Sequence, residues 1–256
     1  MSGETHNVVL YDASNGIAHI TLNRPEKHNA LNDELIAGLK DALRRADNDS
    51  QMRVVILSGS GTDFCSGADL AALQKISSST VAENLTDAQS LMELFLLIRT
   101  IKVPVVAAVR GRALAGGCGL ATACDMVLAA RSSRFGYPEV KVGFVPAMVM
   151  AILRRNVSEK IAFELMTTAR EISAEQAARF GLVNQVVEDE SFESDVTAFA
   201  QTFLKTSASA VALTKQLMYR TDAMSFEDAL HFGVDANVIA RMSRDCQDGI
   251  AKFLKR

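Results

Sequence analysis

The stretch Val103–Pro146, VPVVAAVRGRALAGGCGLATACDMVLAARSSRFGYPEVKVGFVP, places a cluster of glycines between two short apolar runs. The first run, Val103–Val109, ends at Arg110-Gly111 and is typical of a buried strand. Gly116–Gly119 then opens a segment of small residues, and the second apolar run, Met126–Ala130, follows it. The stretch therefore predicts a strand, a glycine turn, a short helix and a second strand, and the rest of the chain is organised around this unit.

Two features of this stretch are candidates for a functional site. Glycines at a strand-to-helix turn let the backbone approach a ligand, and the first N–H groups of a helix have no partner inside it. The turn at Gly116 is therefore a candidate anion-binding site. Further along, Pro138 restricts the backbone just before Glu139, and that carboxyl group lies in a loop between apolar stretches. We expect Glu139 to lie in a dry pocket.

The same layout occurs once more, earlier in the chain. Arg53–Leu57 is an apolar strand pattern, Ser58–Gly61 is a turn, and Gly67 precedes a helical pattern with Asp69 in its expected first turn, a favourable place for a carboxylate. Repeated strand, turn and helix units indicate a spiral α/β core. From the pattern alone, an ordinary doubly wound sheet remains the alternative.

The chain begins with a predicted hairpin. Asn7–Tyr11 and Ile17–Leu22 are β-rich and flank Asn15-Gly16, which is a strong hairpin turn sequence. From Leu31 onward, apolar residues recur with helical spacing, and Asn32 is one of two adjacent residues able to cap that helix. We expect this helix to end near residue 48.

The second half of the chain is mostly helical in pattern. Spacing and capping residues predict helices at Thr80–Ile101, Ala147–Leu153, Ser158–Thr168 and from the capping box at Ser173 to Gly181. Leu182–Val187 can return as a short strand. From Ser191 to Arg256 apolar and charged residues alternate at helical spacing, with an apolar surplus suited to packing on a partner subunit. We therefore divide the chain into a core at 1–190 and a C-terminal helical region at 191–256.

Composition excludes several classes of function. The formal net charge of −3 argues against a nucleic-acid partner, since such a partner requires a basic face. The cysteines form no CxxC pair and have no histidines at zinc spacing, which predicts free thiols in a reducing cytosol and no metal site. The N-terminal residues lack the pattern of a signal peptide, and the longest apolar runs are too short to span a bilayer. We expect a soluble, cytoplasmic protein with no membrane partner.

Taken together, the motifs resemble the enoyl-CoA hydratase/isomerase family, the crotonase superfamily. They follow one another along nearly the whole chain, as Asn23–Pro25 with Asn29–Leu31, Phe64–Leu70, Ala115–Leu120 with Cys124-Asp125, and Phe135–Glu139 with Gly143 and Pro146. The resemblance implies an α/β fold, a crotonase-like spiral of β-β-α turns with a C-terminal α-helical trimerisation region. It also implies a homotrimer or a hexamer built as a dimer of trimers.

The resemblance assigns roles to particular backbone groups. The thioester oxygen of an acyl-CoA substrate would lie between the N–H groups of Ala68 and Gly116, which would stabilise an enolate more than the ground state. Coenzyme A would be held by the segment around Lys27, His28 and Ala30, with Lys27 on a phosphate.

The backbone at Ala68, Asp69 and Leu70 would hold the pantetheine and adenine together with the segment Glu26–Ala30. Gly119 and Pro138 belong to the same predicted substrate site. No separate cofactor is implied, because coenzyme A is part of the substrate.

The main departure from the family pattern is at Gly119. Hydratases of the family usually carry two glutamates, one at this position and one at the position of Glu139, and here only Glu139 is present. A single carboxylate is sufficient for a Δ3,Δ2-enoyl-CoA isomerase, which moves one proton between two carbons. However, the run Glu139–Ala147 resembles the methylglutaconyl-CoA hydratase subgroup, which favours reversible hydration of a short or branched 2-enoyl-CoA. A non-catalytic acyl-CoA binder is the third hypothesis.

Overall fold

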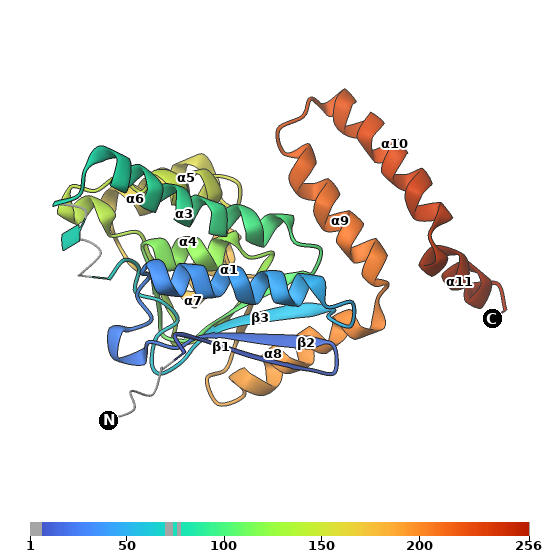
Figure 1. Ribbon diagram of the computed structural model, residues 1–256, viewed down its shortest axis with the longest axis horizontal. Coiled ribbons are helices and arrows are strands. Elements are labelled where there is room, and N and C mark those ends of the chain that lie inside the picture. The colour runs from blue at the N-terminus through green and yellow to red at the C-terminus, as the bar shows by residue number, and fades with distance from the viewer. Residues whose placement is uncertain (1–6, 70–73, 76–77, 256) are drawn as a thin grey trace.

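The computed structural model describes residues 7–69, 74–75 and 78–255, and these form two sheets with helices on both sides (Figure 1). The larger sheet has the order β1-β2-β3-β4-β6-β9 and the smaller one the order β5-β7-β8. The strands are β1 (Val9–Ser14), β2 (Ile17–Leu22), β3 (Val54–Gly59), β4 (Val105–Val109), β5 (Arg112–Leu114), β6 (Met126–Ala130), β7 (Arg134–Gly136), β8 (Ile172–Ser173) and β9 (Gln185–Val187).

The helices of the core follow the predicted boundaries closely. They are α1 (Asp33–Asn48), α3 (Val81–Thr100), α4 (Gly116–Ala123), α5 (Ala147–Leu153), α6 (Glu159–Thr168), α7 (Ala174–Phe180) and α8 (Phe192–Gln201). Three short 3-10 helices connect these elements, namely η1 (Pro25–Lys27), η2 (Glu139–Val142) and η3 (Thr202–Lys205).

The strand pairings confirm the predicted spiral. Strands β2, β3, β4, β6 and β9 pair in parallel, each with the next strand of the large sheet. The segments that follow these strands also pair in parallel with one another. The pairs are Leu31 with Ala68, Cys65 with Ala113, and β5 with β7. Successive turns are therefore stacked in two rows, which distinguishes the spiral from a doubly wound sheet.

Both faces of the large sheet are buried at its inner strands β3, β4 and β6, and alternate residues of each strand point to opposite faces. Val55, Leu57 and Ala107 face the main core beneath α1, α3 and α4, whereas Val54 and Val106 face a second core. That second core is closed by α8, which lies on the opposite side of the sheet (Figure 1).

Local capping chemistry accounts for several helix ends. The Asn32 side chain accepts a hydrogen bond from Leu35 N at 2.9 Å and caps α1. Thr80 and Ser173 form complete capping boxes for α3 and α7. Asn15 and Gly16 have φ of 50° and 81°, as the predicted two-residue hairpin turn requires. The predicted cap at Asn32, the predicted capping box at Ser173 and the predicted hairpin turn are confirmed.

Three local predictions differ from the structure. The loop expected after Gly111 contains strand β5, which pairs with β7 far along the chain. Leu85 lies on the apolar stripe that helical spacing predicts for Thr80–Ile101 but is 57% exposed, because the buried residues of α3, Leu94, Phe95 and Ile98, all lie in its later turns. Asp69 lies in an extended bridge segment rather than a first helical turn, and its carboxylate forms an ion pair with Arg24.

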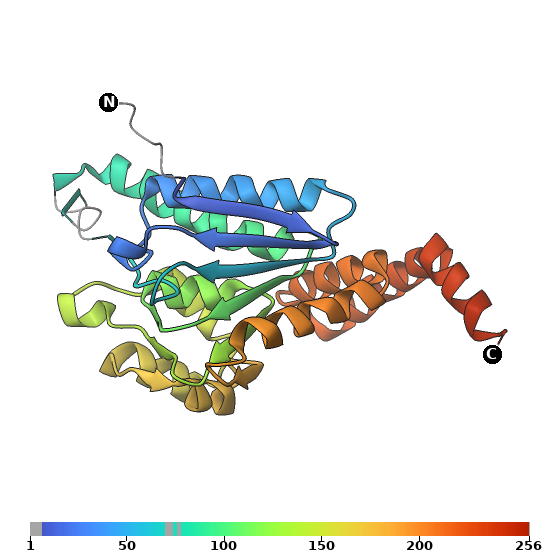
Figure 2. The same cartoon turned by 90° about the horizontal axis from the view of Figure 1, so that it is seen from below.

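The last three helices, α9 (Ala208–Thr221), α10 (Phe226–Met242) and α11 (Arg244–Phe253), extend away from the body of the molecule (Figures 1 and 2). The division of the chain at residue 191 stays a proposal, since α8 packs on the sheet whereas α9, α10 and α11 extend from it. None of the helices among the described residues has both the length and the apolar character needed to cross a bilayer.

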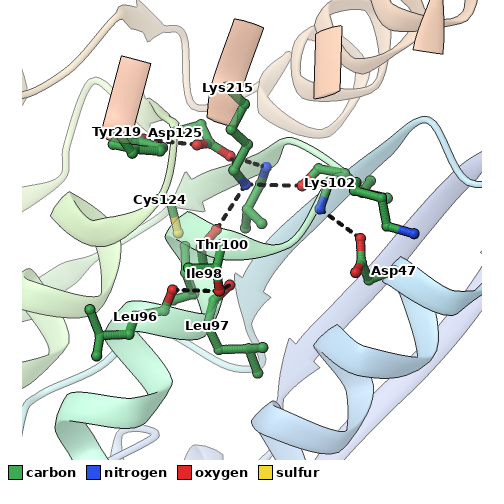
Figure 3. Close-up of polar contacts among 12 residues, drawn as sticks. Asp47, Leu96, Leu97, Ile98, Thr100, Lys102, Cys124, Asp125, Lys215 and Tyr219 are labelled. Carbon is green, nitrogen blue, oxygen red and sulfur yellow. Dashed lines mark hydrogen bonds and ion pairs between the residues drawn. The ribbon is translucent and has the colours of Figure 1, made fainter. Parts of the chain in front are cut away.

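A buried ion pair attaches α9 to the core (Figure 3). Lys215 Nζ donates to Asp125 Oδ2 at 2.7 Å and to the carbonyl oxygens of Ile98 and Val103 at 2.8 and 3.1 Å. Tyr219 donates its hydroxyl to Asp125 Oδ1 at 2.8 Å. Burial lowers the pKa of Lys215, and the Asp125 carboxylate opposes that shift. One side chain of α9 thus links the end of α3, the start of β4 and the end of α4.

Candidate active site

The segment around Ala68 lies directly against the N-terminus of α4. Leu31 N donates to Gly67 O at 2.6 Å and Asp69 N donates to Leu31 O at 3.1 Å, so Ala68 N–H points away from Leu31. Gly67 has φ of 97°, and a Cβ on it would lie 2.7 Å from Ala115 Cβ and 3.6 Å from Gly116 N. Only glycine allows this close approach, which brings the two predicted donor segments together.

The backbone before α4 is held in an unusual conformation. Ala115 has φ of 49° and ψ of −128°, a backbone conformation that residues other than glycine rarely adopt. The hydrogen bond from Ala115 N to Gly136 O at 2.8 Å holds this conformation. Within the part of the chain that the structure describes, neither Ala68 N–H nor Gly116 N–H has an acceptor. Two free donors beside a helix N-terminus form a potential oxyanion hole.

Glu139 supplies the candidate carboxyl group of the site. It begins η2 directly after Pro138, and its Oε2 atom is buried and has no hydrogen-bond partner. Burial raises the pKa of Glu139 above its usual value. Its charge also acts on Cys118, whose pKa is raised to about 12, chiefly by burial. Glu139 therefore lies close to α4, and Cys118 is a neutral thiol that contributes no nucleophile.

The space beside Gly119 is filled by other helices. A Cβ built on Gly119 would lie 2.2 Å from Val149 Cγ1 and 3.4 Å from Phe95 Cζ. Val149 comes from α5 and Phe95 from α3, and both are buried. Where a side chain at position 119 would project, the protein has hydrocarbon.

Arg24 holds the predicted coenzyme A segment against the donor segment. Its Nη2 lies 2.7 Å from Asp69 Oδ2, and its Nη1 donates to Ala30 O at 2.6 Å. Lys27 and His28 lie on the exposed turn between Arg24 and Ala30. His28 Nδ1 lies 2.8 Å from Asp63 Oδ2. The prediction for Leu70 lies outside the described residues.

Comparison with known proteins agrees with this geometry. The model of the family "Enoyl-CoA hydratase/isomerase" matches residues 12–256. The chain belongs to this family.

Relatives and solved structures support the assignment. A putative enoyl-CoA hydratase of Thermus thermophilus is 39% identical over 94% of this chain and 95% of its own length. Crotonyl-CoA hydratase of Syntrophomonas wolfei is 34% identical over 98% of this chain and 95% of its own length. The crystal structure of an enoyl-CoA hydratase from Mycobacterium smegmatis superimposes with a TM-score of 0.93, at 31% identity, over 97% of this chain and 96% of that one. These neighbours confirm the crotonase fold.

Within this enoyl-CoA hydratase/isomerase family member, the structure brings the segment of Ala68 against Gly116, and the charge of Glu139 acts on Cys118 of α4. It also adds residues that sequence reasoning did not assign. Arg24 belongs to a sequence motif in which it has no assigned role, and Val149 lies within the predicted helix Ala147–Leu153 with no role of its own. Asn29 is fully buried and donates to Ser60 O and Asp63 O, both at 2.8 Å, which fixes the turn before Ala30.

The sequence signal for a structural role of Asn29 was its place as a polar residue in the motif Asn29-Ala30-Leu31. Nothing in the local pattern indicated Val149, since an apolar residue on a predicted helix is ordinary.

Proposed function

We propose that this protein catalyses reversible hydration of a short or branched 2-enoyl-CoA. The observation that carries the proposal is the buried Oε2 atom of Glu139, which has no hydrogen-bond partner, in a chain that also presents free backbone N–H donors at Ala68 and Gly116 and belongs to the enoyl-CoA hydratase/isomerase family. The donors match the oxygen of a thioester, and the glutamate matches the proton that such a reaction must move.

In the proposed mechanism, the Glu139 carboxylate removes a proton from water as the water oxygen bonds to C3 of the substrate. The electron pair of the double bond moves toward C1, and negative charge develops on the thioester oxygen. Ala68 N–H and Gly116 N–H stabilise that charge, and removal of one such donor lowers rates by about 10²–10³. Glu139 then returns its proton to C2, which completes hydration with a single acid-base group.

The pKa of Glu139 fits this double duty. A carboxyl group with its ordinary pKa is a poor acid-base catalyst near neutral pH, because it holds a proton for too small a fraction of the time. Burial raises the pKa of Glu139 and so improves its ability to return the proton.

Isomerisation of a 3-enoyl-CoA is the alternative that one observation favours. Val149 fills the space of the second family glutamate, so the pocket offers one carboxylate, which is sufficient for proton transfer between C2 and C4. Two relatives that match nearly the whole chain are named as hydratases, one of them crotonyl-CoA hydratase. These names support hydration as the first choice.

The test uses both reactions on the same preparation. Crotonyl-CoA is mixed with the purified protein, and we expect the absorbance of the conjugated thioester to fall. Conversion of a 3-enoyl-CoA with no loss of crotonyl-CoA would establish the isomerase instead. Tight acyl-CoA binding by calorimetry with neither reaction would establish the non-catalytic binder.

We also propose that Lys27, His28 and Ala30 hold coenzyme A together with the backbone at Asp69. Support comes from the exposed Lys27 side chain on a turn that Arg24 attaches to the donor segment. A Lys27→Ala variant is expected to raise KM with little change in kcat, because a phosphate contact binds ground state and transition state alike. Pro138 is proposed to set the orientation of Glu139, and no separate cofactor takes part.

For the assembly we propose a homotrimer or a hexamer. The outward face of α10 carries exposed apolar side chains at every fourth position, Phe226, Leu230, Val234, Val238 and Met242. Ala236, on the other face, is buried. A stripe of this length in water calls for a partner surface. We place the protein in the cytoplasm, a proposal supported by its free cysteines.

A further inference from the structure

The acyl group of the proposed substrate must extend along α4. With the thioester oxygen held at Gly116 N–H, the next residue on the same face of the helix is Gly119, one turn further on. The acyl carbons beyond the carbonyl group therefore run toward the part of α4 that contains Gly119. Whatever lies against Gly119 bounds the acyl pocket.

Two side chains lie there. Val149 Cγ1 would be 2.2 Å from a Cβ on Gly119, and Phe95 Cζ would be 3.4 Å from it. Each of these side chains is only 5% exposed, so both are fixed by packing on all sides. We call Val149 and Phe95 the acyl wall.

A separate cavity of about 420 Å³ lies beyond the acyl wall, between α3, α5 and α9. Phe95 lines this cavity, together with Leu96 of the same helix and Ile152 of α5. Phe95 also faces Gly119, so the same aromatic side chain contacts α4 at this position and lines the cavity. The cavity has the volume to accept an alkyl chain, and its lining combines apolar residues with the charged side chains Arg99, Arg155 and Arg220. The wall blocks the direct route to it.

The geometry points to Val149, supported by Phe95, as the residue that sets the acyl-chain limit of this enzyme. This inference rests on the proposed action on 2-enoyl-CoA thioesters. Short and branched acyl groups end against the Val149 methyl groups. Longer straight chains meet the wall and are excluded from the cavity behind it. Val149 thus takes the space of the missing second glutamate and converts it into a specificity element.

The experiment compares kcat/KM for crotonyl, hexenoyl, octenoyl and decenoyl thioesters of coenzyme A. The wild type is expected to prefer the crotonyl thioester. Val149→Ala removes the methyl groups over Gly119, and we expect its octenoyl-to-crotonyl ratio of kcat/KM to rise by about 10-fold or more, the usual discrimination of a closely packed apolar pocket. Met150→Ala, on the neighbouring and half-exposed residue of α5, is the matched control and should keep the wild-type ratio.

Phe95→Leu shrinks the other side chain of the wall and should shift the ratio in the same direction, which keeps the test decisive if Val149→Ala does not fold. An unchanged ratio in both folded wall variants, or a wild type that uses octenoyl-CoA as well as crotonyl-CoA, would overturn the inference. Failure of the proposed function has a different signature, because the wild type would then be inactive on every thioester of the series.

Discussion

The ion pair between Lys215 and Asp125 allows a quantitative prediction about how the C-terminal helices are held. The two side chains are 5% and 8% exposed. Changing Lys215 to methionine leaves Asp125 charged and buried, with Val105 N and Tyr219 as its remaining donors. The carbonyl groups of Ile98 and Val103 lose their contact with the ammonium group.

Removing one partner of a buried ion pair typically lowers the free energy of unfolding by about 3–5 kcal/mol. We expect Lys215→Met to fall in this range, because methionine matches the lysine stem in length and leaves the packing of α9 largely intact. The control is Lys75→Met, which removes an ion pair with Asp33 whose side chains are 53% and 71% exposed. An exposed pair contributes about 0–1 kcal/mol.

Urea denaturation followed by circular dichroism measures both variants at one protein concentration, so that the assembly state is matched. A second measurement adds Asp125→Asn to Lys215→Met. This double variant should recover part of the loss, because it removes the uncompensated buried charge. A loss below about 1 kcal/mol for Lys215→Met, equal to that of Lys75→Met, would refute the view that this pair attaches α9 to the core.

Further predictions concern the site and the assembly. Glu139→Gln should lower kcat by about 10²–10⁴, and turnover at the wild-type rate would show that the base lies elsewhere. Burial raises the pKa of Glu139 above 4.5, so wild-type stability falls as pH rises from 4.5 through the folded-state pKa. Glu139→Gln should therefore be more stable than the wild type at pH 7. Thermal denaturation below pH 4.5 should show no difference between the two proteins. Gly119→Ala should destabilise the protein by about 1–3 kcal/mol through its contact with Val149, and Val149→Ala in the same chain should relieve it; additive losses in a double-mutant cycle would contradict this contact. Leu230→Glu should reduce the assembly state seen by sedimentation, whereas Asp235→Asn on the same helix should not; an unchanged mass for Leu230→Glu would exclude this face of α10 from the interface.

Much of the fold was readable from local chemistry. Asn15-Gly16 between β-rich runs specifies a tight hairpin because both residues tolerate positive φ. Asn32 and Ser173 specify helix starts because their side chains satisfy free backbone N–H groups. Such signals act over a few residues. Strand β5 was missed for the same reason, since three residues next to Gly111 become a strand only by pairing with β7.

The candidate site divides in the same way. The sequence by itself determined that Gly116 opens a short helix, that Glu139 follows a proline in an apolar setting, and that position 119 has no side chain to offer. Only the tertiary structure decided what occupies that space. Val149 and Phe95 come from helices on either side of α4 in the chain, and they meet Gly119 because α3 and α5 pack on α4. Local periodicity marks such residues as buried but does not specify which surface they meet, because that depends on the packing of whole helices.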